Sequence, residues 1–191
     1  MDFIRQEIEE SLKVKELLLD DENIHKLIKE SAALCCEALI NDKKIIFAGN
    51  GGSAADAQHL AGELVNRFGF ERPGLSAIAI TTDTSVITSI SNDYGFEKLF
   101  SRQVQALGKK GDILVALSTS GNSVNIIEGI KEAKGIGITT IGLTGKSGGK
   151  MSMFCDLLLN VPSDNTPRIQ EAHILIGHII CSLIENSLFE K

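Results

Sequence analysis

The sequence predicts an α/β fold: a doubly wound, five-stranded parallel sheet flanked by helices, in the flavodoxin-like strand order 2-1-3-4-5. Five short runs are apolar throughout instead of alternating with polar residues, as expected for strands that helices cover on both faces. Segments with helical periodicity separate the first four of these runs. Because strand and helix alternate along the chain, the strands should be parallel and joined by right-handed crossovers.

Two amphipathic helices are expected before the sheet, because apolar residues recur at helical spacing in residues 3–19 and 22–40. The strands are expected at 44–49, 76–81, 112–118, 138–144 and 156–161. The remaining helices are expected at 53–67, 84–91 with 96–107, 122–134, a short turn near 148–154, and 167–188. Pro167 fits the first turn of this closing helix.

Length and charge indicate a single cytoplasmic domain. The 191 residues suffice for one full core, so we expect one domain over 1–191, with helices in 1–41 and the α/β core with its closing helix in 42–191. The net charge of −6 and the scattered basic residues argue against a nucleic-acid partner. No uninterrupted apolar run reaches the roughly eighteen residues of a membrane span, and the charged start "MDFIRQEIEESLK" is unlike a signal peptide. A membrane partner is therefore not expected.

The four cysteines are predicted to be buried free thiols. Cys35, Cys36, Cys155 and Cys181 lack the spacing of a metal finger, and two of them are adjacent. A buried thiol in a reducing compartment is favoured over a disulfide or a metal ligand.

The loop "AGNGGSA" follows the first strand and leads into a helix. Such a junction exposes backbone N–H groups at the positive end of the helix dipole, and glycines let the backbone approach a ligand closely. Asn50, Gly51 and Gly52 could therefore form an anion site, to which Ser53 adds a hydroxyl. A simple tight turn with Ser53 as the helix N-cap is an equally good interpretation of this loop alone.

A second loop, "STSGNS", favours the ligand-binding interpretation. Its hydroxyls follow the third strand, and they belong to Ser118, Thr119, Ser120 and Ser123. In the order 2-1-3-4-5, strands one and three are neighbours, so their two loops should flank the crevice where α/β sheets bind ligands. Together they suggest a site for a phosphate group held without lysine.

Two helices supply candidate acid–base residues. His59 and Glu63 are four residues apart and share one helix face, although an exposed polar stripe or a structural pair explains them more simply. His178 lies in an apolar run of the closing helix, eight residues after Gln170, where a buried structural histidine is the simpler explanation. On the same helix, Glu171 and His173 are expected to be structural and Glu185 to be solvated.

The stretches "GNGGSAADAQHLAGEL", "STSGNS", "LTGKSGG" and "RIQEAHILIGHI" together resemble the sugar-isomerase (SIS) domain. Over nearly the whole chain, the sequence is most similar to the phosphoheptose isomerase family. The resemblance implies a SIS domain and an aldose–ketose isomerase that interconverts D-sedoheptulose 7-phosphate and D-glycero-D-manno-heptose 7-phosphate. In that family, the product feeds heptose synthesis for bacterial surface polysaccharides such as lipopolysaccharide.

The resemblance also implies roles for individual residues. Ser118, Thr119, Ser120 and Ser123 would hold the phosphate, and the sugar would be lined by Asn50, Gly51, Gly52, Asn92 and Asp93. One zinc ion per subunit would be held by His59, Glu63, Gln170 and His178. Family members are homotetramers that share sites between subunits, and Arg67 matches a residue that reaches a neighbouring site. Some members have an acidic residue where this chain has Pro167, so a sugar contact from this position is not carried over to this chain.

For the isomerase we assign Glu63 as the base that moves a proton between carbons and His178 as the acid–base group on the oxygens, with an enediol between them. Glu63 cannot be a tight metal ligand and a free base at once, so either the metal is loosely held or the carboxylate shifts. The alternatives are a SIS protein without activity that binds a replication initiator or senses a sugar phosphate, and an isomerase of pentose or hexose phosphates. Having both Glu63 and His178 favours the enzyme.

Overall fold

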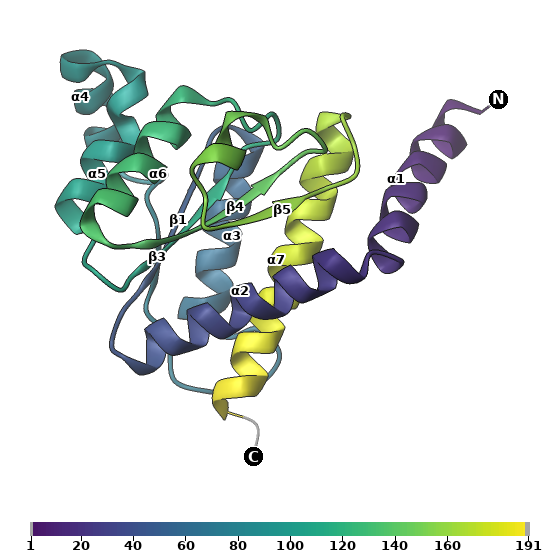
Figure 1. Ribbon diagram of the computed structural model, residues 1–191, viewed down its shortest axis with the longest axis horizontal. Helices are drawn as coiled ribbons and strands as arrows, with labels where there is room; N and C mark the ends of the chain where they lie inside the picture. The colour runs from purple at the N-terminus through teal and green to yellow at the C-terminus, as the bar shows by residue number, and fades with distance from the viewer. Residues whose placement is uncertain (1, 190–191) are drawn as a thin grey trace.

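The computed structural model describes residues 2–189 and contains the predicted parallel sheet in the predicted order β2-β1-β3-β4-β5 (Figure 1). The strands are β1 (Ile45–Gly49), β2 (Ala77–Ala79), β3 (Ile113–Leu117), β4 (Thr139–Thr144) and β5 (Leu157–Asn160). The register pairs Gly49 with Leu117, so β1 and β3 end side by side. The loops that follow these two strands therefore leave the sheet at the same edge.

Helices cover both faces of the sheet. The first face carries α2 (Glu22–Ile40), α3 (Gly52–Val65) and α7 (Thr166–Phe189), and the second carries α5 (Leu99–Leu107) and α6 (Val124–Ile136) (Figure 1). Successive strand residues pack into opposite layers, since Phe47 joins the first core and Ile46 the second. This two-sided burial explains why the strands are apolar throughout.

The first helix, α1 (Phe3–Leu19), projects away from the sheet (Figure 1). Contacts to α7 hold it: Ser11 donates to Glu171 at 2.7 Å, and Arg168 donates to the Glu7 carbonyl. Its apolar residues Phe3 and Ile4 remain 71% and 67% exposed. The predicted amphipathic helix is present, but this chain leaves much of its apolar face in contact with solvent.

The largest differences from the expected elements lie at exposed edges. Strand β2 has only three residues, and Ile78 is 39% exposed, because β2 is the edge strand and is covered less than its neighbours. Helix α4 (Thr84–Tyr94) runs three residues further than expected, and two short helical turns, η1 (Phe96–Lys98) and η2 (Gly149–Met153), lie between longer elements.

The expectation that Ser53 caps α3 is wrong. Gly51 is the N-cap, with a φ of 55° that favours glycine, and Ser53 lies buried inside the first turn. The N-terminus of α3 thus has no side-chain cap.

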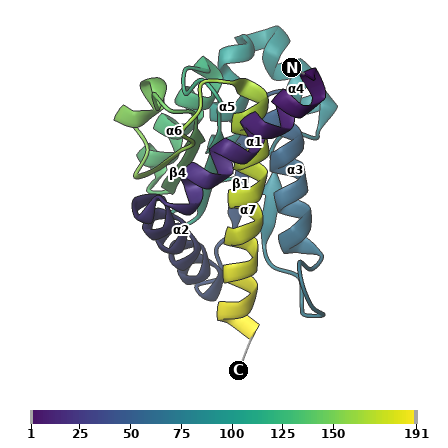
Figure 2. The same ribbon diagram turned by 90° about the vertical axis from the view of Figure 1, so that its right-hand side faces the viewer.

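Helix α7 is long and apolar enough to cross a membrane by length and composition, with a mean hydropathy of 1.4 in its most apolar window. In this structure it is a core helix that packs against α2 and α3 (Figure 2). It also carries buried polar side chains, including Arg168, His173 and Glu185, which a lipid-facing helix would not tolerate.

Buried His173 predicts an acid-sensitive fold. Burial lowers the pKa of His173 from 6.5 to about 4, so the unfolded chain binds a proton more readily than the folded one. We expect the free energy of unfolding to fall as the pH drops from about 6.5 to about 4, by on the order of 3 kcal/mol from this residue. Urea denaturation across that range measures it. His173→Leu should flatten the profile, and an unchanged profile contradicts this account.

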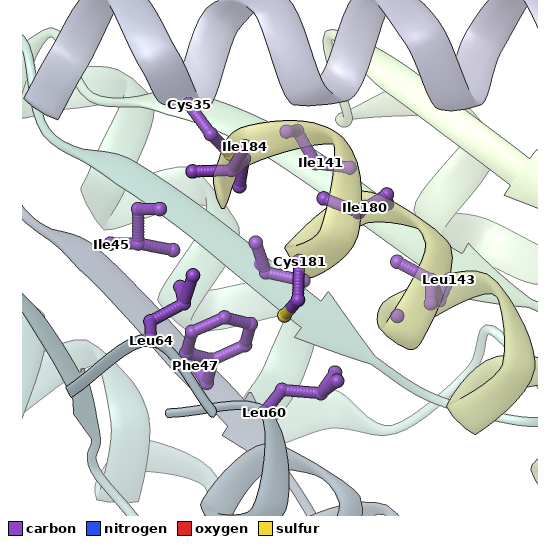
Figure 3. Close-up of a pocket in the computed structure, with 12 residues that line it drawn as sticks. Cys35, Ile45, Phe47, Leu60, Leu64, Ile141, Leu143, Ile180, Cys181 and Ile184 are labelled. Carbon is purple, nitrogen blue, oxygen red and sulfur yellow. The ribbon is translucent and has the colours of Figure 1, made fainter. Parts of the chain in front are cut away.

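The cysteines are free thiols, and three of the four are buried as predicted, while Cys155 is half-buried. Burial raises the pKa of Cys181 to about 12, so its thiol stays protonated and unreactive. Cys181 lines a small apolar cavity of about 20 Å³ between the sheet, α3 and α7 (Figure 3).

At the same cavity, α3 and α7 pack closely at Gly177. A Cβ atom at residue 177 would lie 2.5 Å from Cδ2 of Leu60, which is itself 2% exposed. The close approach at residue 177 brings His178 on α7 next to His59 on α3.

We expect Gly177→Ala to lower the free energy of unfolding by about 1–3 kcal/mol, because the cavity is too small to take up the displaced side chain. Denaturant titration measures the change. Gly135→Ala is the control, since its added Cβ meets no atom within 4 Å. The double change Gly177→Ala with Leu60→Val should recover part of the loss, and equal stability of the two single variants contradicts the close-packing argument.

Candidate active site

Helices α3 and α7 run side by side from the edge of the sheet where the strands end (Figure 2). They meet at three levels. Gly52 lies against the amide of Gln170 at the top, Leu60 against Gly177 in the middle, and the backbone of Phe68, just beyond α3, donates to Glu185 at the bottom. The candidate acid–base residues lie at the middle level.

His59, Glu63 and His178 form one cluster. Nε2 of His59 lies 3.0 Å from Oε1 of Glu63 and 2.9 Å from Nε2 of His178. The ligand atoms of all three lie within 4.8 Å of one another, so the group could hold a metal ion. The His59 side chain is 50% exposed and that of Glu63 25%, which leaves the cluster open on one side. The cluster therefore brings His178 of α7 to His59 and Glu63 of α3.

Asp56 belongs beside this cluster and was missed in the sequence. It lies one turn before His59 on α3. Partial burial raises the pKa of Asp56 above its usual range, although the nearby imidazoles of His59 and His178 act in the opposite direction. One oxygen of Asp56 is buried without a hydrogen-bond partner among the described residues. The spacing D-x-x-H on one helix face was the available signal.

The two loops predicted to flank one crevice follow neighbouring strands that end side by side. The side-chain amides of Asn50 and Asn125 exchange two hydrogen bonds of 2.9 Å, which joins the glycine loop to the start of α6. Buried Ser118 and half-buried Ser123 share a hydrogen bond of 3.0 Å between their hydroxyls. Thr119 and Ser120 line a cavity of about 240 Å³ that continues to Lys146.

Other predicted residues lie outside the cluster. Gln170 packs on Gly52, two helical turns before His178. Asn92 and Asp93 hydrogen-bond to each other on exposed α4. Arg67 is half-exposed and lies 3.8 Å from Glu71. Gln170 would have to leave Gly52 to join His59, so a role for Gln170 in metal binding stays a prediction. The roles of Asn92, Asp93 and Arg67 in substrate binding also stay predictions.

Within one chain, the cluster of His59, Glu63 and His178 is separated from the glycine loop along the axis of α3. His59 follows Gly52 by seven residues, which is about 10 Å along the helix axis. A ligand bound to both must therefore be extended, or the loops and the cluster must come from different subunits.

The expectation that Glu185 is solvated is wrong. The side chains of Glu185 and Arg72 are each 1% exposed and form an ion pair of 2.8 Å. Burial raises the pKa of Glu185, but hydrogen bonds from the Phe68 and Gly69 amides and from Arg72 outweigh it and hold the pKa below its usual range. The position of Glu185 near the helix end suggested that it is exposed to solvent. Its partner Arg72 could not be recognised from the local sequence, because it lies in a loop more than a hundred residues earlier.

The sheet order and the hydroxyl-lined loop at its switch point define a SIS-domain protein, and the model of the SIS domain matches residues 12–145. The chain is 56% identical over 190 residues to a phosphoheptose isomerase of Aneurinibacillus thermoaerophilus, covering 100% of this chain and 96% of the relative. The chain belongs to the phosphoheptose isomerase family, whose members are isomerases.

Solved structures agree with this assignment. A phosphoheptose isomerase from Francisella tularensis matches with a TM-score of 0.93 at 40% identity, covering 97% of each chain. The enzyme of Neisseria gonorrhoeae matches with a TM-score of 0.89 at 46% identity, covering 96% of this chain and 97% of that one.

Proposed function

We propose that the chain interconverts D-sedoheptulose 7-phosphate and D-glycero-D-manno-heptose 7-phosphate. The observation that carries the proposal is the cluster of His59, Glu63 and His178, in which a carboxylate and two imidazoles meet at hydrogen-bond distance. Aldose–ketose isomerisation needs one base at carbon and one acid–base group at oxygen, and these side chains supply both.

In the proposed mechanism, Glu63 removes a proton from C1 of the ketose. The electron pair of the broken C–H bond forms a C1=C2 double bond, and His178 gives a proton to O2, so a cis-enediol results. Glu63 then returns its proton to C2 while His178 takes the proton from O1, and the aldehyde forms at C1. Both residues end the cycle in their starting protonation states.

The cluster also fits a zinc ion. Two imidazoles and a carboxylate are the donor set that zinc sites use, and their ligand atoms already converge. We propose one zinc ion per subunit held by His59, Glu63 and His178, with Gln170 as a fourth ligand if its amide turns away from Gly52. When bound, zinc would polarise the sugar carbonyl and stabilise negative charge on its oxygen. The carboxylate of Glu63 would then alternate between the metal and the carbon proton.

At the other end of the ligand, we propose that the hydroxyls and amides of residues 118–123 bind the phosphate. Asn50, Gly51, Gly52, Ser53, Asn92 and Asp93 would contact the sugar. We also propose a homotetramer in the cytoplasm with sites shared between subunits, to which half-exposed Arg67 contributes. The product would serve bacterial surface polysaccharides.

The test of this function is incubation with sedoheptulose 7-phosphate, with products read by NMR after chelation and after zinc is restored. We expect an aldoheptose 7-phosphate, more of it with zinc, and none from unphosphorylated sedoheptulose. Arabinose 5-phosphate and fructose 6-phosphate serve as competing substrates. Faster conversion of either, or no conversion of any sugar phosphate, contradicts the proposal.

Ser120→Ala is expected to raise KM for the heptose phosphate by about tenfold with little change in kcat. The phosphate is bound equally in the ground state and the transition state, so losing one donor weakens both alike. Steady-state kinetics measure the split, and Ser152→Ala, an exposed serine of η2, is the control. A fall confined to kcat contradicts a phosphate-binding role.

A further inference from the structure

We propose that the buried pair Arg72–Glu185 is a positioning device that holds Glu63 and His178 in their working geometry. The proposal rests on the proposed function of the cluster, and neither residue of the pair belongs to the cluster itself. The pair joins α7 to the segment that follows α3, further along both helices than His59 and His178.

Arg72 ties together the end of α3. Its guanidinium donates from Nη2 to the carbonyl of Glu63 at 2.9 Å and from Nη1 to the carbonyl of Leu64 at 2.8 Å. Further bonds from Nη1 reach the carbonyls of Asn66 and Pro73. The last carbonyls of a helix have no hydrogen-bond donor within the helix. Here the Arg72 side chain donates to two of them, those of Glu63 and Leu64. The backbone of Glu63 is therefore held directly.

Glu185 connects this arrangement to α7. It accepts from Nε of Arg72 at 2.8 Å and from the backbone amides of Phe68 and Gly69 at 2.9 and 2.6 Å. Glu185 lies seven residues, about two turns, beyond His178 on the same helix. Arg72 thus bonds to the backbone of Glu63, and its partner belongs to the helix that carries His178.

The segment between them also contacts the cluster. The ring of Phe68, whose amide Glu185 binds, lies with its centroid 5.5 Å from that of His178. The pair therefore acts on the cluster along two routes: through the Glu63 backbone, and through Phe68 against the His178 imidazole.

A need for stability alone would not require this pair. Replacing a buried ion pair with apolar side chains of similar volume is often neutral or stabilising. What an apolar pair cannot do is bind four carbonyls and two amides at fixed positions. Groups that orient active-site or metal-binding residues in this way typically change activity or metal affinity by 10- to 100-fold when removed.

The experiment compares three proteins: the unaltered chain, the double variant Arg72→Met with Glu185→Met, and Arg72→Lys. The double variant leaves no unpaired buried charge and is expected to fold, as circular dichroism and thermal melting will report. The control is Lys44→Met with Asp112→Met, which removes an ion pair between the residues that directly precede β1 and β3, and in which Asp112 is 1% exposed and Lys44 23%. Each protein is measured for kcat, KM and zinc affinity by competition with a chromogenic chelator.

We expect the double variant to lose about 10- to 100-fold in kcat and about 10-fold in zinc affinity, with KM changed less than threefold. Arg72→Lys keeps the positive charge but loses the planar guanidinium and its several donors. Its kcat and zinc affinity should therefore lie between those of the unaltered chain and those of the double variant. The control should keep its kcat and zinc affinity at temperatures where it is folded. A folded double variant with kcat and zinc affinity within twofold of the unaltered chain overturns the proposal, as does an equal kcat loss in the control.

Failure of the proposed function would look different. The unaltered chain would then convert no heptose phosphate. The positioning role can still be measured in that case, from the ¹⁵N resonances of the His59 and His178 imidazoles. We expect the double variant to shift these resonances and the control to leave them unchanged. Unshifted resonances in the double variant overturn the positioning role whatever the reaction is.

Discussion

Replacing Glu63 with glutamine is expected to lower kcat for the heptose phosphate by about 10²- to 10⁴-fold, the range that general-base catalysis contributes. The amide keeps the shape of the side chain but cannot accept a proton from carbon. Its oxygen can still face Nε2 of His59, which lies 3.0 Å from the carboxylate, so the fold should persist. Steady-state kinetics with NMR detection of the aldose measure the loss.

Glu30→Gln is the matched control, because Glu30 is an exposed glutamate on α2. It should leave kcat unchanged. Turnover of Glu63→Gln within threefold of the unaltered chain, with the protein folded, contradicts the assignment of Glu63 as the base.

Replacing His178 with glutamine is expected to lower kcat by about a hundredfold or more, since the variant cannot exchange protons with the sugar oxygens. Because Nε2 of His178 lies 2.9 Å from Nε2 of His59, the same change should also weaken zinc binding. A metal ligand and an acid–base group are thus lost together. Chelator competition and kinetics on the same preparation measure both effects.

His25→Gln is the control for this change. His25 on α2 hydrogen-bonds to the carbonyl of Leu18 on α1 at 2.9 Å and is not part of the cluster. Full zinc affinity in His178→Gln would separate the two roles and remove His178 from the proposed ligand set. Full turnover would remove it from the mechanism.

The sheet could be predicted from the sequence because each strand carries its own signal. Ile45 to Gly49 and Ile113 to Leu117 are buried on both faces, and their uninterrupted apolar runs indicate this without knowledge of the partner strands. The strand order then predicted two donor-rich loops at one edge of the sheet. The paired amides of Asn50 and Asn125 join the first loop to the start of α6, the helix that follows the second loop.

What the sequence did not predict depends on contacts between distant residues. Arg72 and Glu185 are separated by 113 residues, and both are charged residues of types that are seldom fully buried. Glu185 was expected in solvent because it is charged and close to the helix end, yet a loop closes over it and supplies three donors. Ser53 was expected as a cap because its type favours that role, but the positive φ of Gly51 moved the helix start.

Isomerisation in D₂O tests most directly whether Glu63 transfers a proton through an enediol. We predict that an aldoheptose 7-phosphate brought to equilibrium by the enzyme carries deuterium at C2, because a carboxylate that holds the migrating proton exchanges it with solvent over repeated turnovers. Complete absence of deuterium at C2 at equilibrium would indicate direct hydride transfer between C1 and C2, and would contradict the role of Glu63 as the carbon base.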